Sequence, residues 1–227
     1  MAISPSSLRR RGERLRERAS FLQALFILDQ AIIKSVDDNS PEDLILSLKD
    51  RSLTWLHLFN TTQSPSFLIL ARKDAEAMVE TAKTNNLSPS LAVSYYTLAK
   101  TYAARGDNPN ALKNYTLALN HFSGTEAESG DYLYHLGEAH YLAGHKKKGK
   151  SFLLQGLKLI RRHRFQVETF LSQVWETRCL MVLAKLLQSE SPVESKRYRE
   201  EAARALKSNP KLILLRGLFL QWFDQTP

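Results

Sequence analysis

The sequence predicts an all-α protein of about ten helices that pair as antiparallel hairpins. Apolar residues recur at spacings of three and four through almost the whole chain, and no segment alternates in the manner of a β-strand. Serine followed by proline opens three successive segments, at Ser40, Ser64 and Ser88, because serine caps a helix and proline fits its first turn. The connections between segments are short, so consecutive helices are expected to lie antiparallel.

Each expected helix ends at a polar turn or at a glycine. Gly106 and Gly144 end two of them, because glycine readily adopts the left-handed conformation found just after a helix. A polar linker, residues 123–130, separates the fifth helix from the sixth. The helices are expected over residues 19–36, 41–59, 65–85, 89–106, 109–122, 131–144, 147–162, 166–188, 192–207 and 210–223. They form a single helical domain, residues 19–227, after a basic N-terminal segment, residues 1–18.

The composition favours a cytoplasmic chain without disulfides. Its one cysteine, Cys179, excludes an intramolecular disulfide and leaves no cysteine partner for a structural metal site. The arginine-rich start followed by the apolar residues 21–28 has the order of a signal peptide, yet Gln23 and Asp29 interrupt the pattern and no cleavage site follows. No stretch reaches the roughly 18 to 20 apolar residues that a membrane span needs.

Two segments share one pattern of large and small residues. In the first segment the pattern consists of Tyr95, Leu98, Ala99, Tyr102, Gly106, Ala111, Tyr115 and Ala118. In the second, 38 residues later, it consists of Leu133, Leu136, Gly137, His140, Tyr141, Gly144, Gly149, Leu153 and Gly156. Large residues fill the space between the two helices of a hairpin, and small ones let the helix axes approach each other. The pattern resembles that of the tetratricopeptide repeat.

This resemblance implies a short right-handed solenoid of stacked helical hairpins. Clear repeats are expected at residues 92–125 and 130–163, a degenerate one at residues 167–210, and a terminal helix at residues 210–223. A further diverged hairpin is expected around residues 55–82. The alternative is an unrelated helical bundle, because such bundles also repeat residue sizes at spacings of three and four.

Similarity to this family also implies a non-catalytic interaction module or scaffold that binds a peptide or protein in its concave groove. The residues that it places on the inner surface are Tyr96, Lys100, Tyr134, Glu138, Tyr141, Arg178 and Lys185. Tyrosine suits recognition, because its ring offers rigid apolar area and a polar tip. The alternative is that the tyrosines pack between repeats. The clamp with which some members hold a C-terminal carboxylate is not evident, since Lys100 and Glu138 stand where it needs asparagine.

A basic stretch at residues 139–167 supports a second function, the binding of RNA or another polyanion. It contains eight lysines and arginines and no acidic residue. The candidate anion-binding residues are Lys146, Lys147, Lys148, Lys150, Arg161, Arg162 and Arg164. They gather at the two ends of one helix, roughly 24 Å apart for about 16 residues, and so do not form one compact patch. The alternative is that these basic residues are simply solvated at loops and helix ends. The arginine-rich start of the chain can likewise be a surface helix without a ligand, because Glu13 and Glu17 can pair with its arginines.

No pattern in the sequence indicates a catalytic, cofactor or metal site, and we expect no enzyme. His135, His140 and His145 are spaced by five residues. This spacing turns each about 140° past the last around a helix, so they are not expected to converge on a metal. Cys179 stands among apolar residues and is expected in the core. No glycine-rich phosphate loop occurs.

The expected terminal helix, residues 210–223, is apolar on nearly every side, whereas a terminal helix of a solenoid needs a polar outer face. Other protein surface must therefore cover it. The helix can fold back against the helix at residues 192–207, or it can pack on a partner or on a second copy of the chain. We expect self-association through this helix.

Overall fold

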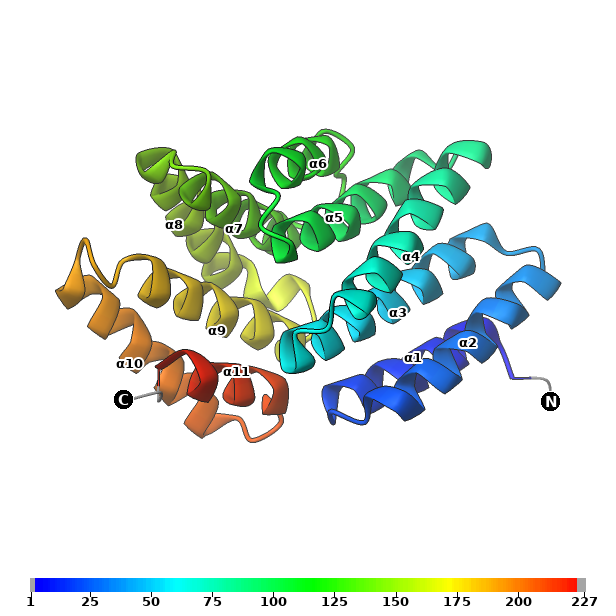
Figure 1. The fold of residues 1–227 in the computed structure, drawn as a ribbon, viewed down its shortest axis with the longest axis horizontal. Helices are drawn as coiled ribbons and strands as arrows, with labels where there is room; N and C mark the ends of the chain where they lie inside the picture. Colours follow the sequence, from blue (N-terminus) through cyan, green and yellow to red (C-terminus); the bar gives the residue numbers. More distant parts are fainter. Residues whose placement is uncertain (1–2, 224–227) are drawn as a thin grey trace. The chain divides into compact units, whose positions relative to one another are not determined.

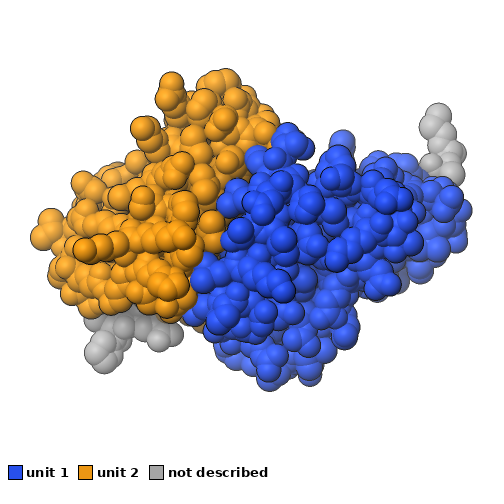
Figure 2. All heavy atoms as spheres, turned by 90° about the horizontal axis from the view of Figure 1, so that it is seen from above, with its two compact units in different colours: residues 1–123 blue, residues 124–227 orange. Residues whose placement is uncertain are grey.

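The computed structural model describes residues 3–223, and these residues form helices and the connections between them (Figure 1). The helices are α1 (Pro5–Glu17), α2 (Phe21–Asp37), α3 (Pro41–Thr62), α4 (Pro65–Thr84), α5 (Ser88–Ala104), α6 (Asn108–Asn120), α7 (Glu126–Leu142), α8 (Lys146–His163), the 3-10 turn η1 (Arg164–Gln166), α9 (Thr169–Leu186), α10 (Pro192–Ser208) and α11 (Ile213–Phe223). The all-α prediction is confirmed, and each of the ten expected helices is present. The chain divides into two compact units, unit 1 up to Ser123 and unit 2 from Gly124 (Figure 2).

Local sequence signals determine most helix ends. Thr125 and Glu128 form a capping box at the start of α7, in which each side chain accepts a hydrogen bond from the other residue's backbone N–H. Gly106 and Gly144 follow α5 and α7 with φ of 79° and 89°, the left-handed region that glycine enters without strain. α11 begins later than expected, at Ile213. The chain turns first, because the backbone N–H of Lys211 donates to the side chain of the preceding Asn209.

Unit 1 contains three antiparallel hairpins, α1–α2, α3–α4 and α5–α6. The first includes α1, which lies in the segment expected only to be basic. Gly12 on α1 lies so close to α2 that an added Cβ would stand 2.6 Å from Cγ of Leu28. The N-terminal segment is therefore an integral part of the helical packing, and α1 also packs against α3.

A buried ion pair joins α1 to α3. The carboxylate of Asp50 is fully buried, and it lies 3.0 Å from Nη1 of Arg16 and 3.1 Å from Nη1 of Arg9. Burial alone would raise the pKa of Asp50, but the charges of Lys49 and Arg16 hold it below its ordinary value. The expected local pairs also form, because Arg16 contacts Glu17 at 3.1 Å. The long-range pair with Asp50 is what orients α1.

We predict that Asp50→Ala lowers the free energy of unfolding by about 3–5 kcal/mol, because it removes the buried anion of Arg16 and leaves this guanidinium only the partly exposed carboxylates of Glu13 and Glu17. Urea unfolding followed by circular dichroism measures the loss. Glu76→Ala removes a carboxylate from exposed pairs on α4 and should cost no more than about 0.5 kcal/mol. Equal losses in the two variants would contradict a special role for Asp50.

The same ion pair should make stability depend on pH. The pKa of Asp50 is lowered in the folded chain. The ionised carboxylate therefore contributes fully to the free energy of unfolding above the pKa of aspartate in the unfolded chain, about 3.9. That contribution is lost as the pH falls through the folded pKa.

Unit 2 contains the hairpins α7–α8 and α9–α10 and the terminal helix α11. Four glycines bring α7 and α8 together, Gly130 and Gly137 on α7 and Gly156 and Gly149 on α8. A Cβ on Gly149 would lie 2.6 Å from the backbone nitrogen of Tyr141. The two backbones thus approach more closely than the alanines usual in this repeat would allow.

We predict that Gly149→Ala lowers the free energy of unfolding by about 1–3 kcal/mol, because the added methyl group meets backbone atoms that must shift. The higher helix propensity of alanine offsets only about 1 kcal/mol of this loss. Gly217→Ala on α11 is the control, since no heavy atom lies within 4 Å of its added Cβ. The midpoint of urea unfolding should fall for Gly149→Ala alone, and a rise in both variants would contradict the close approach.

Among the described residues, none of the helices combines the length and the apolar character needed to cross a membrane.

Candidate functional site

The helices α7 and α9, which contact each other in unit 2, bring together four of the residues expected on the inner surface. Tyr134 and Glu138 lie one turn apart on α7, and Arg178 and Lys185 lie two turns apart on α9. We call the surface formed by these four residues the α7–α9 face. Arg178 acts electrostatically on both Tyr134 and Glu138, so the two helices present these side chains to one another.

The α7–α9 face carries an excess of positive charge. Burial alone would raise the pKa of Glu138, but the hydrogen bond with His135 and the charge of Arg178 hold it below its ordinary value. Lys185 acts in the same direction. Burial and the charge of Arg178 lower the pKa of Lys185 itself. Two cations therefore share the face with one carboxylate.

The terminal helix α11 packs against α9, and its residue Trp222 contacts both cations. The centre of the Trp222 ring lies 4.4 Å from Cζ of Arg178 and 4.2 Å from Nζ of Lys185. These distances are typical of cation–π contacts. Other apolar residues of α11, among them Leu218 and Phe219, pack against the core of unit 2. The apolar terminal helix is thus folded back, as one of the sequence interpretations proposed. That interpretation named α10 as its neighbour, but Trp222 of the terminal helix packs on α9.

Among residues 3–223, the ring of Trp222 contacts both Arg178 and Lys185, and Glu138 acts on Lys185 through its charge. Neither side chain forms a hydrogen bond or an ion pair within this range. Nη1 of Arg178 is buried without an acceptor. A buried guanidinium nitrogen without an acceptor lowers the stability of the fold, because burial removes the water that hydrogen-bonded to it and no protein atom takes the place of that water.

The three expected tyrosines have buried rings. Tyr96, Tyr134 and Tyr141 are 8%, 2% and 7% exposed, so little of each side chain is open to solvent. Tyr96 lies on α5 in unit 1, where its ring is 5.7 Å from that of Tyr115 and the ammonium of Lys100 lies 5.2 Å above it. A role in recognition for Tyr96 and Lys100 stays a prediction.

The hydroxyl of Tyr141 reaches the C-terminal end of α9. Its hydroxyl lies 3.0 Å from the carbonyl oxygen of Leu186 and 2.7 Å from Oε2 of Glu190. Burial and the hydrogen bond with Glu190 raise the pKa of Tyr141 to about 12. This hydroxyl links the end of α7 to the end of α9, and a role in recognition for Tyr141 stays a prediction.

Comparison with known proteins identifies the fold. No family model matches the chain, and a search of curated proteins found no match. A crystal structure of a Podosopora anserina protein, assigned as a kinesin light chain with nearly identical TPR-like repeats, matches with a TM-score of 0.58 and 16% sequence identity, covering 92% of this chain and 99% of that chain. A variant of that protein matches with a TM-score of 0.59 and 15% identity, covering 92% and 98% of the two chains. The chain has a tetratricopeptide-like repeat fold.

In the tetratricopeptide-like fold, α5–α6 and α7–α8 are the hairpins that carry the two clear copies of the pattern. The first helices of successive hairpins, α5, α7 and α9, hold the seven residues expected on the inner surface. The sequence did not single out Trp222, which the structure places directly on two of them. Its only sequence signal was a large aromatic residue in a helix too apolar to stand exposed.

The candidate anion-binding residues of the basic stretch lie on α8, the second helix of its tetratricopeptide-like hairpin, and at the start of η1, and three of the seven are paired with carboxylates. Lys146 pairs with Glu190, and Nζ of Lys150 lies 2.7 Å from Glu194. Arg161 lies 2.7 Å from Glu176 and 2.6 Å from Glu201. The remaining candidates form no ion pair in the described part of the chain; they are Lys147, Lys148, Arg162 and Arg164. Anion binding by this stretch stays a prediction.

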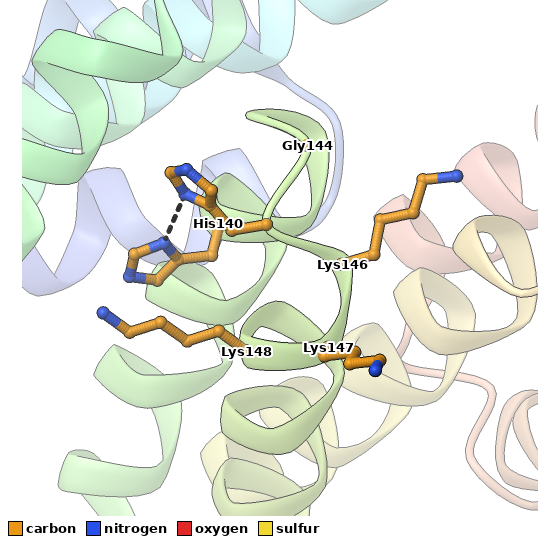
Figure 3. A pocket seen from close by; sticks show the side chains of 6 residues that line it. His140, Gly144, Lys146, Lys147 and Lys148 are labelled. Carbon is orange, nitrogen blue, oxygen red and sulfur yellow. Dashed lines mark hydrogen bonds between the residues drawn. The ribbon is translucent and has the colours of Figure 1, made fainter.

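Two of the expected histidines meet at an open pocket beside the turn between α7 and α8 (Figure 3). The two Nδ1 atoms of His140 and His145 lie 3.3 Å apart. The two rings meet because the chain turns at Gly144 and His145 lies outside the helix on which the spacing was counted. Lys148 extends on the same side as the imidazoles, and burial and its charge lower the pKa of His140. The described residues include no group of three or more potential metal ligands.

Cys179 is fully buried, with Sγ 3.6 Å from the carbonyl oxygen of Leu153. Burial raises the pKa of its thiol well above the ordinary value, which keeps the thiol protonated and unreactive. The prediction that this residue belongs to the core is confirmed.

Proposed function

We propose that the chain is a non-catalytic protein-interaction module, and that the α7–α9 face is the part of its concave groove that binds a helical segment of a partner protein. Tetratricopeptide-like repeats generally mediate contacts between proteins, through the extended surfaces that their stacked hairpins create. The observation that carries the proposal is α11 itself. The face already accommodates one apolar helix, anchored by Trp222 on Arg178 and Lys185.

The contact between α11 and unit 2 is weak enough for a partner to replace it. No residue of α11 is buried, and Ile213 and Leu220 are 45% and 49% exposed. The helix has 11 residues, and isolated helices shorter than about 12–15 residues are marginal in water. α11 therefore depends on its packing, and a longer helix that covers the same face offers more apolar contact.

A labelled synthetic peptide with the sequence of residues 210–223 tests whether the face binds a helix supplied from outside. Its binding is measured by fluorescence anisotropy against the intact chain and against the double variant Phe219→Ala, Trp222→Ala. We predict that the peptide binds the double variant about tenfold more tightly, because the substitutions remove cation–π contacts worth about 0.5–1 kcal/mol each and so expose the face.

A matched double variant, Ile213→Ala with Leu220→Ala, is the control, because it shortens two exposed residues of the same helix. It should bind the peptide no more tightly than the intact chain does. The proposal fails if the peptide shows no preference for the chain that lacks Phe219 and Trp222.

A second copy of the chain is one source of a helix like α11, and self-association through residues 210–223 stays a prediction. Binding of RNA or another polyanion remains the second candidate. The pairing of Lys146, Lys150 and Arg161 with glutamates reduces the charge available for it.

A further inference from the structure

Two histidine side chains meet beside the turn that joins α7 to α8. The two Nδ1 atoms of His140 and His145 lie 3.3 Å apart, and the planes of the two rings are inclined by 55° (Figure 3). Two neutral imidazoles form such a contact when one ring donates an N–H and the other accepts with its lone pair. Each ring thus presents the same nitrogen to the other at the edge of an open pocket.

The backbone between the two histidines holds them in this position. The N–H of His145 donates to the carbonyl oxygen of His140 at 2.9 Å, and the N–H of Gly144 donates to that of Tyr141 at 3.0 Å. The ring of His140 also stacks on Phe152, with the ring centres 5.6 Å apart. The arrangement therefore forms without a ligand, and a ligand of both nitrogens meets groups that are already in place.

The distance between the two nitrogens matches that between two ligands of a tetrahedral metal ion. Zinc binds imidazole nitrogen at about 2.0–2.1 Å in tetrahedral geometry, so two of its nitrogen ligands lie about 3.3–3.4 Å apart. The observed distance is 3.3 Å. At the same bond lengths, neighbouring ligands of a square-planar ion such as Cu²⁺ lie only about 2.8–3.0 Å apart. The geometry of the pair therefore favours zinc over a square-planar ion.

The charge of Lys148 limits how tightly this pocket can bind a cation. Of the three lysines labelled in Figure 3, Lys146 and Lys147 extend away from the imidazoles, whereas Lys148 extends toward them. A positive charge in that position opposes a second one. Imidazole itself is mostly neutral at about pH 7.5, so both rings can offer a lone pair to a metal. We therefore expect a site of moderate affinity that a neighbouring charge weakens.

We infer that His140 and His145 chelate a zinc ion through their Nδ1 atoms at the turn between α7 and α8. The ion takes the place of the hydrogen bond between the rings, and the proton of the donating ring moves from Nδ1 to Nε2 of the same ring. Two positions of the tetrahedron remain for water from the open pocket. The inference is separate from the proposed function, because it uses no residue of the α7–α9 face.

Calorimetric titration of zinc chloride into the chain at about pH 7.5 tests the site. We expect the intact chain to bind zinc, and His145→Gln, at an exposed position, to bind it at least about tenfold more weakly. Loss of a direct ligand should cost no less than loss of an outer-shell partner, which costs about 10–100-fold. His163→Gln is the matched control, because it removes an imidazole that lies beside Phe165 at the other end of α8. It should leave the affinity unchanged.

Two further measurements locate the bound ion. In nitrogen-15 NMR spectra, zinc should shift the Nδ1 resonances of His140 and His145 and leave those of the other histidines in place. Magnesium chloride should shift none of them, because Mg²⁺ prefers oxygen ligands. Lys148→Gln should bind zinc about two- to tenfold more tightly than the intact chain, because it removes the opposing charge.

Four results overturn the inference. The first is an intact chain that takes up no zinc, and the second is a His145→Gln variant that binds zinc as tightly as the intact chain does. A shift confined to other histidines places the ion elsewhere. Weaker zinc binding by Lys148→Gln indicates that an anion carries the ion into the pocket, which contradicts direct chelation. Each of these results leaves the proposed binding of a helix at the α7–α9 face intact.

Discussion

The close approach of α7 and α8 is the constraint on which the geometry of unit 2 depends. Gly137 and Gly149 let the two backbones touch, because a Cβ at either position would lie within 2.8 Å of backbone atoms of the other helix. This contact fixes α7 against its hairpin partner and leaves its other side to meet α9. Tyr134 lies between the two neighbours, since its Cβ adjoins Gly156 of α8 and its ring packs in one cluster with residues of α9. The glycines therefore influence where the α7 half of the face stands.

Which cations of unit 2 have carboxylate partners depends on which helices pack beside them. α8 lies beside α9 and α10, whose glutamates reach its lysines and arginine. α9 has no such neighbour over Arg178 and Lys185, and Trp222 is the group that covers them. The indole ring lies against both cations; Lys185 stays exposed, whereas Nη1 of Arg178 is buried without an acceptor among the described residues. Three cations of α8 are thus paired, whereas Arg178 on α9 keeps one buried guanidinium nitrogen without an acceptor among the described residues.

Both ends of the described chain form additional helical packing beyond the repeats. At the start, the buried carboxylate of Asp50 holds α1 against α3 through Arg16. At the other end, α11 rests on α9 through apolar contacts and keeps several residues exposed. The first contact is a buried, charge-assisted pair and the second a partly exposed apolar one. We therefore expect α11 to detach more readily than α1.

The sequence by itself determined the helices, because apolar periodicity, proline starts and glycine ends are local properties that each segment carries alone. It also indicated the repeat, since the small residues of α5 to α8 reflect close packing of neighbouring helices. Only the tertiary structure decided which charges are paired: the glutamates that neutralise Lys146 and Arg161 lie 15 to 44 residues away. It alone placed Trp222 on Arg178 and Lys185, because contacts between distant segments depend on which faces meet, and no local pattern encodes that choice.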